Sequence, residues 1–321
     1  MALALALSIA CAAGVLAAAV GGRPPTPGAE PAGGGAGADP ARLRRHVEGI
    51  VALGPRDLAH PDGLDRAAEW IAAALREHAP FVTTQAFAAG GRTYRNVVAR
   101  FGPPSRERII VGAHYDAAGA LPGADDNASG VAGLLELARL LAASPPPGTI
   151  ELVAFTLEEP PAFAGPEMGS AVHAASLARE GVAVRLMLSL EMIGFFTDAK
   201  GSQSFPAPGL GLVYPTTGNF IAVVGRIGEG RVVRRVRDAM RAATPLGVES
   251  IAAPRSLPGV DLSDHRSYWD RGWPAVMITD TAFFRNPNYH GPGDTPDTLD
   301  YARMAQVVTG VHAAVLDAVR R

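Results

Sequence analysis

The segment VGAHYDAAGALPGADDNASG at residues 111–130 places one histidine and three aspartates among glycines and alanines, directly after an apolar run. Two later apolar runs also end in carboxylates: TIELVAFTLEE ends in Glu158 and Glu159, and VRLMLSLEM carries Glu191 near its end. A solvated loop would explain any one of these, because strand ends are commonly polar. Burying several carboxylates together is costly, so a bound cation explains the three together better.

The eight histidines divide into two groups. Five lie in helix-like sequence or in a polar turn, and we interpret them as structural or surface residues: His46, His60, His78, His173 and His312. The other three are His114, beside the acidic segment, and His265 and His290, in loop-like sequence late in the chain. The sequence holds no H-E-x-x-H pair, which excludes a thermolysin-like zinc site on one helix.

Charge balance indicates how many ions such a cluster would hold. The candidate ligand set is His114, Asp126, Glu159, Glu191 and His290. Its three carboxylates contribute −3, which two divalent ions and one hydroxide would balance, whereas a single ion would leave the cluster negative. Nitrogen and oxygen donors without sulfur suit zinc, with cobalt or manganese as tolerable substitutes.

Strands that alternate with helices predict an α/β domain whose sheet is covered on both faces. Extended or buried-strand patterns occur at 81–88, 94–101, 108–115, 149–159, 184–196, 220–225 and 274–280. Helical patterns occur at 39–53, 63–78, 129–143, 167–180, 230–243 and 301–320. Ligands of such folds bind beyond the carboxyl ends of the strands, where the runs ending in His114, Glu159 and Glu191 would meet.

Composition limits the function classes. Hydrophobic residues make up 48% and charged residues 19% of the 321 residues, which allows a globular core. The formal net charge is −2, and no basic patch suited to nucleic acid is present in the sequence. Cys11 is the only cysteine, so thiol catalysis and thiolate metal sites are excluded in the folded part.

The N-terminal forty residues predict targeting sequence and a linker. Residues 1–20, MALALALSIACAAGVLAAAV, form an uncharged apolar run typical of a signal peptide or a retained signal anchor. We therefore expect export, to a secreted or periplasmic location, or anchoring to the membrane. Residues 21–39 are rich in Gly, Pro and Ala and predict a flexible linker, which leaves 40–321 as the catalytic domain.

Six motifs occur in one order along residues 40–321: HYD, GADDNASG, LEEPP, LSLEMIG, SDHRSYW and NPNYHGPGDTPDTLDY. In these motifs the chain resembles the secreted dizinc aminopeptidases, whose relatives include glutamate carboxypeptidase and the glutaminyl cyclases. The resemblance implies a zinc exopeptidase-like fold, with a central mixed, mostly parallel sheet and helices on both faces.

The resemblance also implies a role for each member of the ligand set. His114 and Glu191 would bind one zinc ion, Glu159 and His290 would bind a second, and Asp126 would bridge the two. One departure is Glu191, where some members carry Asp. Another is the segment EEPPAFAGPEMGS, which is longer than the common link from the Glu pair to Gly-Ser.

Two further residues receive catalytic roles from the resemblance. Glu158 would be the general base that takes a proton from the metal-bridging water. Asp116 would orient His114 through the second ring nitrogen. Adjacent strand residues face opposite ways, so the Glu158–Glu159 pair must lie where the strand ends and the chain bends.

Several supporting residues keep more than one interpretation. Asp125 and Asn127 would shape the turn that holds Asp126, and Asp294 would stabilise the turn after His290. Asp264 and His265 would contact substrate, buttress the site or cap a helix. Aromatic and methionine residues would line a side-chain pocket or belong to the core: Met192, Tyr268, Phe283, Phe284 and Tyr289.

The sequence favours a metal-dependent aminopeptidase acting on peptides. A single-zinc glutaminyl cyclase is the nearest alternative, although GADDNASG and TLEEPP favour the peptidase. A carboxypeptidase would need a cation for the substrate carboxylate, for which Arg266 and Arg285 are candidates. A non-catalytic, membrane-anchored binding domain on the same scaffold is disfavoured by the intact ligand set and base.

Overall fold

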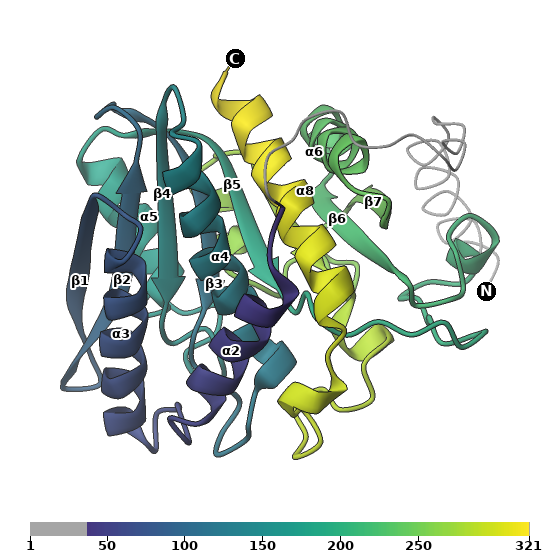
Figure 1. The fold of residues 1–321 in the computed structure, drawn as a ribbon, viewed down its shortest axis with the longest axis horizontal. Coiled ribbons are helices and arrows are strands. Elements are labelled where there is room, and N and C mark those ends of the chain that lie inside the picture. The colour runs from purple at the N-terminus through teal and green to yellow at the C-terminus, as the bar shows by residue number, and fades with distance from the viewer. Residues whose placement is uncertain (1–36, 321) are drawn as a thin grey trace, which may run out of the picture.

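Eight strands form one mixed sheet, seen nearly face-on in the computed structural model (Figure 1). The structure describes residues 37–320. The apolar segment 1–20 and nearly all of the linker at 21–39 lie outside these residues. The predicted α/β architecture, a mostly parallel mixed sheet with helices on both faces, is confirmed.

The strands run in the spatial order β1-β2-β4-β3-β5-β8-β6-β7. Their bounds are β1 Phe81–Ala89, β2 Arg92–Phe101, β3 Glu107–His114, β4 Thr149–Phe155, β5 Ala183–Glu191, β6 Phe220–Arg226, β7 Gly247–Ala253 and β8 Ala275–Thr279. Strands β4, β3, β5 and β8 are mutually parallel neighbours, so their carboxyl ends share one edge of the sheet. Strand β6 is antiparallel to β8 and parallel to β7.

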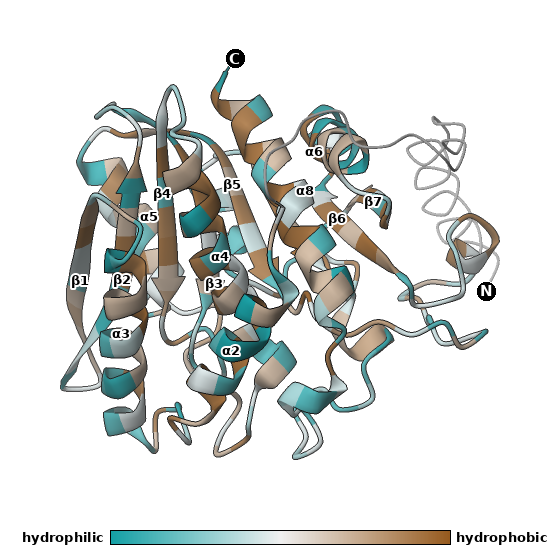
Figure 2. Cartoon of the chain, viewed as in Figure 1, coloured by the Kyte–Doolittle hydropathy of each residue, from teal (hydrophilic) through white to brown (hydrophobic). Residues whose placement is uncertain are grey.

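Five helices cover one face of the sheet, and they stand in front of it in Figure 1. They are α2 Pro40–Val51, α3 Pro61–Arg76, α4 Gly130–Ala143, α6 Gly230–Ala243 and α8 Tyr301–Val319. Asp39 begins the first of them as its cap, since its carboxylate accepts the amide hydrogens of Ala41 and Arg42. On α6, apolar residues face the sheet and hydrophilic residues face outward (Figure 2).

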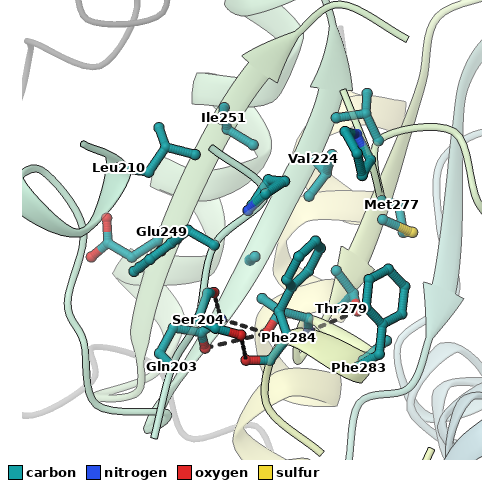
Figure 3. A pocket seen from close by; sticks show the side chains of 18 of the residues that line it. Gln203, Ser204, Leu210, Val224, Glu249, Ile251, Met277, Thr279, Phe283 and Phe284 are labelled. Atoms are coloured by element: carbon teal, nitrogen blue, oxygen red, sulfur yellow. Dashed lines mark hydrogen bonds between the residues drawn. The ribbon is translucent and has the colours of Figure 1, made fainter. Parts of the chain in front are cut away.

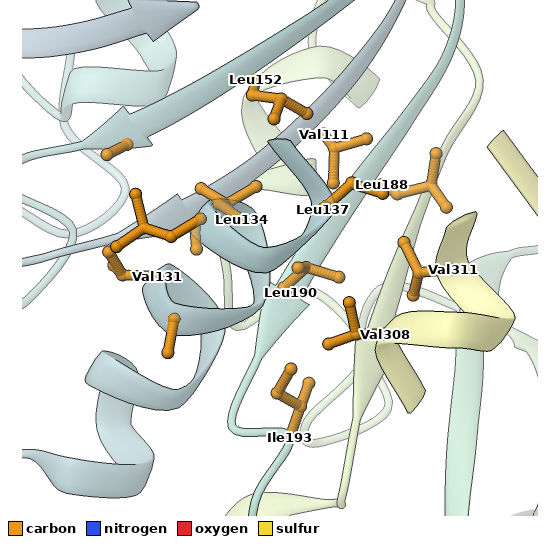
Figure 4. Packing of buried hydrophobic residues seen from close by; sticks show 14 of the residues in the cluster. Val111, Val131, Leu134, Leu137, Leu152, Leu188, Leu190, Ile193, Val308 and Val311 are labelled. Carbon is orange, nitrogen blue, oxygen red and sulfur yellow. The ribbon is translucent and has the colours of Figure 1, made fainter. Parts of the chain in front are cut away.

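The main core lies between this helical layer and the sheet. Strands β3 and β5 are buried on both faces, which explains their near-continuous apolar sequence. On the helical side, Val111, Leu152 and Leu188 pack with Leu134 and Leu137 of α4, as Figure 4 shows. Full burial of one such side chain contributes roughly 1.5–3 kcal/mol, so this core fixes the strands on which the candidate ligands lie.

The opposite face carries α5 Gly169–Arg179 and the short α7 His265–Trp269, which contact β2, β5 and β8. A second apolar cluster lies beneath them, with Val153, Met187 and Tyr268 among its members. Over β6 and β7 this face is covered by the segments 203–214 and 257–262. Loops pack less closely than a helix, and a hollow remains beneath them.

Strand β7 differs from the sequence-based prediction, which contained no strand there. Its sequence GVESIAA mixes Glu and Ser with small apolar residues, and most of its side chains are only half-buried because β7 is an edge strand. The remaining strands and helices follow the predicted order. In the part of the chain that the structure describes, no helix is both long and apolar enough to cross a membrane.

Candidate metal centre

The ends of three parallel strands bring the acidic and imidazole groups together. His114 is the last residue of β3, Glu191 is the last residue of β5, and Glu158 and Glu159 follow the end of β4. All four side chains are buried. The shared edge therefore carries a dense group of ionisable side chains, as the pattern of apolar runs predicted.

Left-handed backbone conformations turn these side chains toward one centre. Leu157, directly before Glu158, has φ +58°, Met192, directly after Glu191, has φ +49°, and His290 itself has φ +49°. Residues other than glycine rarely adopt positive φ, and such conformations cluster at functional sites. The bend at Leu157 is the one that the adjacent Glu158–Glu159 pair required.

Asp126 occupies the middle of the ligand set. Its Oδ1 lies 3.3 Å from Nε2 of His114, and its Oδ2 lies 3.1 Å from Nε2 of His290. Nε2 of His114 also lies 3.5 Å from a Glu191 oxygen, and Nε2 of His290 lies 3.3 Å from a Glu159 oxygen. The two oxygens of one carboxylate thus face two separate histidine–glutamate pairs.

The donor atoms fit divalent metal ions. Buried atoms without a hydrogen-bond partner include Nε2 of His114, Oδ1 of Asp126 and Oε1 of Glu159, and buried polar atoms are rarely left in this state. Two three-residue groups have the spacing of a metal site: His114–Asp126–Glu191 and Asp126–Glu159–His290. Nitrogen and oxygen donors of this kind suit zinc.

A third group with metal-site spacing contains His114, Glu158 and Glu159. The Glu158 oxygen, however, lies 3.8 Å from Nε2 of His114, farther away than the oxygens of Asp126 and Glu191. This geometry leaves Glu158 as the carboxylate beside the ligand set, the position that a general base would need.

Electrostatics of the metal-free chain agree with a cation site. Burial and the charge of Asp126 raise the pKa of Glu159 to about 7, against the opposing effect of His290. Burial also raises the pKa of Glu158 well above its ordinary value, with Glu191 and Glu159 adding to the effect and His114 opposing it. For His290, burial lowers the pKa, but hydrogen bonds to Asp126 and Glu159 outweigh it and bring the pKa to about 10. Protons held by such a cluster are those that a metal ion displaces.

Asp116 contacts His114 mainly through its main chain. Nδ1 of His114 lies 3.2 Å from the main-chain oxygen of Asp116 and 3.6 Å from its carboxylate. The Asp116 carboxylate accepts a 2.9 Å hydrogen bond from the amide of Glu159. Asp116 therefore links the ends of β3 and β4, and its orienting role toward His114 remains a prediction.

Hydrogen bonds fix the turn Ala124–Ser129 that carries Asp126. The Asn127 side chain donates to the oxygen of Leu190 and accepts from the amides of Gly130 and Met192. The Asp125 carboxylate accepts from the amide of Gly194. The bond from Gly130 is the local contact expected of an Asx side chain, whereas the others connect the Asp126 turn to the end of β5.

Asp294 acts differently from the prediction that it stabilises the turn after His290. Its two carboxylate oxygens accept the amide hydrogens of Asp125 and Asp126, at 2.8 and 3.1 Å. The carboxylate therefore holds the Asp126 turn and brings it close to the segment that contains His290. Burial and the charge of Asp125 together raise the pKa of Asp294 to about 7.

The motif SDH positions side chains around Glu191. The Ser263 hydroxyl donates a 2.6 Å hydrogen bond to the Glu191 carboxylate. Asp264 is fully buried, its carboxylate does not cap α7, and neither of its oxygens has a hydrogen-bond partner. His265 buttresses the adjacent loop, because its Nε2 lies 2.8 Å from the oxygen of Val260.

An apolar pocket extends from Glu191 along the face of β6, β7 and β8 (Figure 3). Its walls include Phe220, Ala222, Val224, Ile251, Met277 and Phe284. Among the aromatic and methionine residues considered from the sequence, Phe283, Phe284 and Tyr289 line this pocket. Met192 and Tyr268 are instead buried in the protein interior.

The two arginines considered for a substrate carboxylate are engaged elsewhere. Arg285 is buried and donates to Gln203 and to the oxygen of Phe220, although its Nη2 has no hydrogen-bond partner. The guanidinium of Arg266 stacks 4.8 Å from the ring centre of Phe163, in the longer segment after the Glu pair. Neither arrangement favours recognition of a carboxyl terminus.

Several structural contributors escaped the sequence reasoning. Arg56 is buried beneath the Asp126 turn. The residues around Arg56 in the sequence form no motif that predicts its burial there. Asn286 donates to the Asp125 carboxylate. Asp280 follows the end of β8 and accepts the amide of Phe195, and its place after an apolar run was a signal that could have identified it.

Comparison with known proteins agrees with this geometry. The model of Peptidase family M28 matches residues 96–315, a range that contains the whole ligand set. The chain belongs to peptidase family M28. It is therefore a member of a metallopeptidase family that typically binds zinc.

Among sequence relatives, the M28 chain is 49% identical over 283 residues to the uncharacterized protein YfbL of Escherichia coli (strain K12), covering 85% of this chain and 87% of YfbL. It is 28% identical over 231 residues to a probable leucine aminopeptidase of Trichophyton verrucosum, covering 66% of this chain and 54% of that protein. The chain thus spans about half the length of the latter relative.

Solved structures share the fold of this M28 member. A zinc aminopeptidase from Bacillus subtilis gives a TM-score of 0.70 at 16% identity, covering 88% of this chain and 95% of that chain. A glutaminyl cyclase from Bacteroides thetaiotaomicron gives 0.65 at 19% identity, covering 88% and 98%. One scaffold therefore appears in both classes of enzyme that the sequence suggested.

Proposed function

We propose that this M28 member is a zinc-dependent aminopeptidase that removes single residues from the amino termini of peptides. The observation that carries the proposal is the division of the Asp126 carboxylate between two histidine–glutamate pairs, with Glu158 beside them. This arrangement would hold two zinc ions, with the ligand set in the roles that the resemblance assigns.

The proposed reaction uses the chain's own groups as follows. Bound zinc ions would supply Lewis-acid polarisation of the scissile carbonyl and lower the pKa of the attacking water. Glu158 takes a proton from that water at its carboxylate and delivers it to the departing amine. Ser263 holds the Glu191 carboxylate through its hydroxyl hydrogen bond.

Charge favours the amino terminus over the carboxyl terminus of a substrate. Two zinc ions and a hydroxide would balance Asp126, Glu159 and Glu191, which leaves the negative charge of Glu158 beside them. A protonated amino terminus is attracted by this remaining charge. Because Arg285 is buried and Arg266 stacks on Phe163, neither guanidinium is presented openly to a substrate carboxylate. These observations support an aminopeptidase rather than a carboxypeptidase.

The apolar pocket supports a preference for large apolar N-terminal residues. It reaches Glu191 at one end, and its walls are aliphatic and aromatic. Burying an apolar substrate side chain there contributes roughly 0.8 kcal/mol for each CH₂ group. Leucine, methionine and phenylalanine at the amino terminus are the expected substrates.

A panel of aminoacyl-anilides, together with N-terminally blocked peptides, tests the proposal with and without a chelator. Activity confined to free amino termini and abolished by the chelator supports it. Cleavage of blocked peptides, or hydrolysis that persists after removal of metal, would contradict it.

Metal content separates the peptidase from a glutaminyl cyclase. We expect two zinc ions per chain, because His114 and Glu191 form a second ligand group with Asp126. One ion per chain together with pyroglutamate formation from an N-terminal glutamine would replace the proposal with the cyclase.

We also propose that the enzyme acts outside the cytoplasm or at the membrane. The support is the uncharged apolar sequence of residues 1–20. Fractionation of cells that express the full chain tests this, and recovery in the cytosolic fraction alone would contradict it.

A further inference from the structure

Arg56 lies between α2 and α3, and its side chain is fully buried. It is the largest fully buried side chain among the described residues. Taking a guanidinium out of water is costly unless the surroundings satisfy its donors. Among the described residues, no carboxylate oxygen lies within 4.0 Å of this guanidinium, so ion pairing does not explain its burial.

The hydrogen bonds of the guanidinium all reach the segment between His114 and Asp126. Nε donates to the oxygen of Tyr115 at 2.9 Å, Nη1 to the oxygen of Pro122 at 2.9 Å, and Nη2 to the oxygen of Gly123 at 3.0 Å. The main-chain oxygen of Arg56 also accepts the amide hydrogen of Ala117. One side chain thus joins the residue after His114 to the residues just before the Asp126 turn.

Gly123 shows how closely the segment approaches Arg56. Its φ is +56°, and a Cβ added there would lie 2.8 Å from Nη2 of Arg56 and 2.4 Å from the oxygen of Asp126. Only glycine tolerates this combination of conformation and contact. The segment is therefore closed tightly around the guanidinium.

We propose that Arg56 is a positioning residue that fixes the spacing of His114 and Asp126 and thereby sets metal affinity at the ligand group containing both. The fixed fork of a guanidinium donates along several directions at once, whereas a lysine ammonium is a compact point charge on a flexible stem. The fork accounts for the three separate carbonyl acceptors. The inference rests on the proposed metal centre, but it does not depend on which peptide bond is cut.

The positive charge of Arg56 supplies a second effect that experiment can separate from the first. Asp116, Asp294 and Asp126 lie close enough for their charges to act on it. Burial lowers the pKa of Arg56 to about 10, so the group stays protonated at neutral pH. Its charge offsets repulsion among the carboxylates, while its fork fixes the main chain. Arg56→Lys keeps the positive charge but loses the planar set of guanidinium donors, and Arg56→Met loses both the charge and the donors.

The test is calorimetric titration of the metal-free full chain with zinc, without substrate. Arg56→Lys and Arg56→Met are both expected to lose affinity for one of two ions by about 10- to 100-fold, as loss of a group that orients metal ligands does, while the ion held by Glu159 and His290 is less affected. Cobalt titration, followed by visible absorption, reports the same loss at one site. Because no substrate is present, failure of the aminopeptidase proposal would leave these titrations unchanged.

Arg285→Lys is the matched control, because Arg285 is also buried and also donates to main-chain oxygens, but beside the apolar pocket. It should lower stability while both ions bind with wild-type affinity. Wild-type affinity for both ions in Arg56→Lys and Arg56→Met would overturn the proposal. If Arg56→Lys alone binds both ions with wild-type affinity, the positioning role is overturned, because the positive charge of residue 56 is then sufficient for metal binding.

Gly123→Ala provides a second route if the Arg56 variants do not fold. Its Cβ would lie 2.8 Å from Nη2 of Arg56 and 2.4 Å from the oxygen of Asp126. The substitution therefore disturbs the carbonyl that the guanidinium holds while Arg56 keeps its charge. The same loss of affinity at one ion supports the proposal, and unchanged affinity for both ions overturns it.

Discussion

Two differently built regions lie next to each other on the sheet. Around β3, β4 and β5, the metal side, side chains are polar and buried and are held by hydrogen bonds to neighbouring strand ends, as Asn127 and Asp294 illustrate. Around β6, β7 and β8, the pocket side, the walls are apolar and are completed by the segments 203–214 and 257–262. Leu212 in the first of these segments is 92% exposed.

The difference indicates a division of labour. Geometry on the metal side is over-determined, because Asn127 and Asp294 each hold two or more main-chain groups. The pocket side is shaped by apolar contacts, which are not directional as hydrogen bonds are. Substitutions there therefore change how well a substrate side chain fits the pocket without moving the ligand set. The metal side should therefore determine whether the enzyme acts, and the pocket side which residue it removes.

The largest expected effect is on the metal side. Glu158→Gln keeps the shape of the proposed base and removes its ability to accept a proton, so kcat should fall by about 10²- to 10⁴-fold. Steady-state kinetics on several aminoacyl-anilides measures the fall, which should be equal for large and small N-terminal residues. Zinc content is the control and should equal that of the wild type. A wild-type rate would refute the assignment of Glu158.

Asn127→Ala tests the hydrogen bonding that supports the Asp126 turn. It removes three hydrogen bonds in a fully buried position and should lower the free energy of unfolding by about 2–4 kcal/mol. Urea unfolding of the metal-free protein measures the change.

Tyr214→Phe is the pocket-side comparison for Asn127→Ala. It removes one partly buried hydrogen bond, to the oxygen of Ser250, and should cost about 1 kcal/mol. Equal losses of unfolding free energy in Asn127→Ala and Tyr214→Phe would contradict the proposed difference between the metal side and the pocket side.

Val224→Phe narrows the apolar pocket from the β6 side. The value of kcat/KM for leucine and phenylalanine substrates should fall by about 10- to 200-fold, the range for a misfit in an apolar pocket, while alanine substrates keep their rate. Val224→Ala is the control, and it should leave the largest substrates accepted. A uniform fall for every substrate would place the effect on the metal side instead.

A small pH-dependent effect concerns His265, which joins α7 to the pocket wall at Val260. Burial lowers its pKa to about 3, below the value near 6.5 expected in the unfolded chain. The folded state therefore binds fewer protons, and the stabilisation is complete above pH 6.5 and declines as the pH falls toward 3. Between pH 7.5 and 5.5 the decline should be about 1.4 kcal/mol.

Urea unfolding of the wild type and His265→Gln at both pH values, with chelator present, isolates this contribution of His265. The variant should lack the extra decline. Parallel pH dependence in the two proteins would show that His265 is not held neutral by the fold.

The strand-end residues of the metal side could be predicted from the sequence because their signals are local. Each buried strand is an apolar run, and the residue at its end is the one that reaches the site, as His114 and Glu191 show. Parallel neighbours then bring these ends together without further information. The bend that orients Glu158 also followed from the alternation of side chains along a strand.

Other features depend on contacts between distant segments. Arg56 acts on carbonyl groups from Tyr115 to Gly123, and carbonyls carry no sequence signal. Asp294 holds amides of Asp125 and Asp126 far away in the chain. Strand β7 is too polar to be recognised by its own pattern, and it exists because β6 supplies a parallel partner.

The loop cover over β6 and β7 has a consequence for how relatives of this enzyme can diverge. The segment between β5 and β6 contains no member of the ligand set, and it connects two strands that are already fixed by the sheet. Doubling the length of such a loop adds only about 0.6 kcal/mol of closure entropy. Insertions and deletions there are thus thermodynamically cheap routes to new substrate preferences, with the metal-binding strand ends left intact.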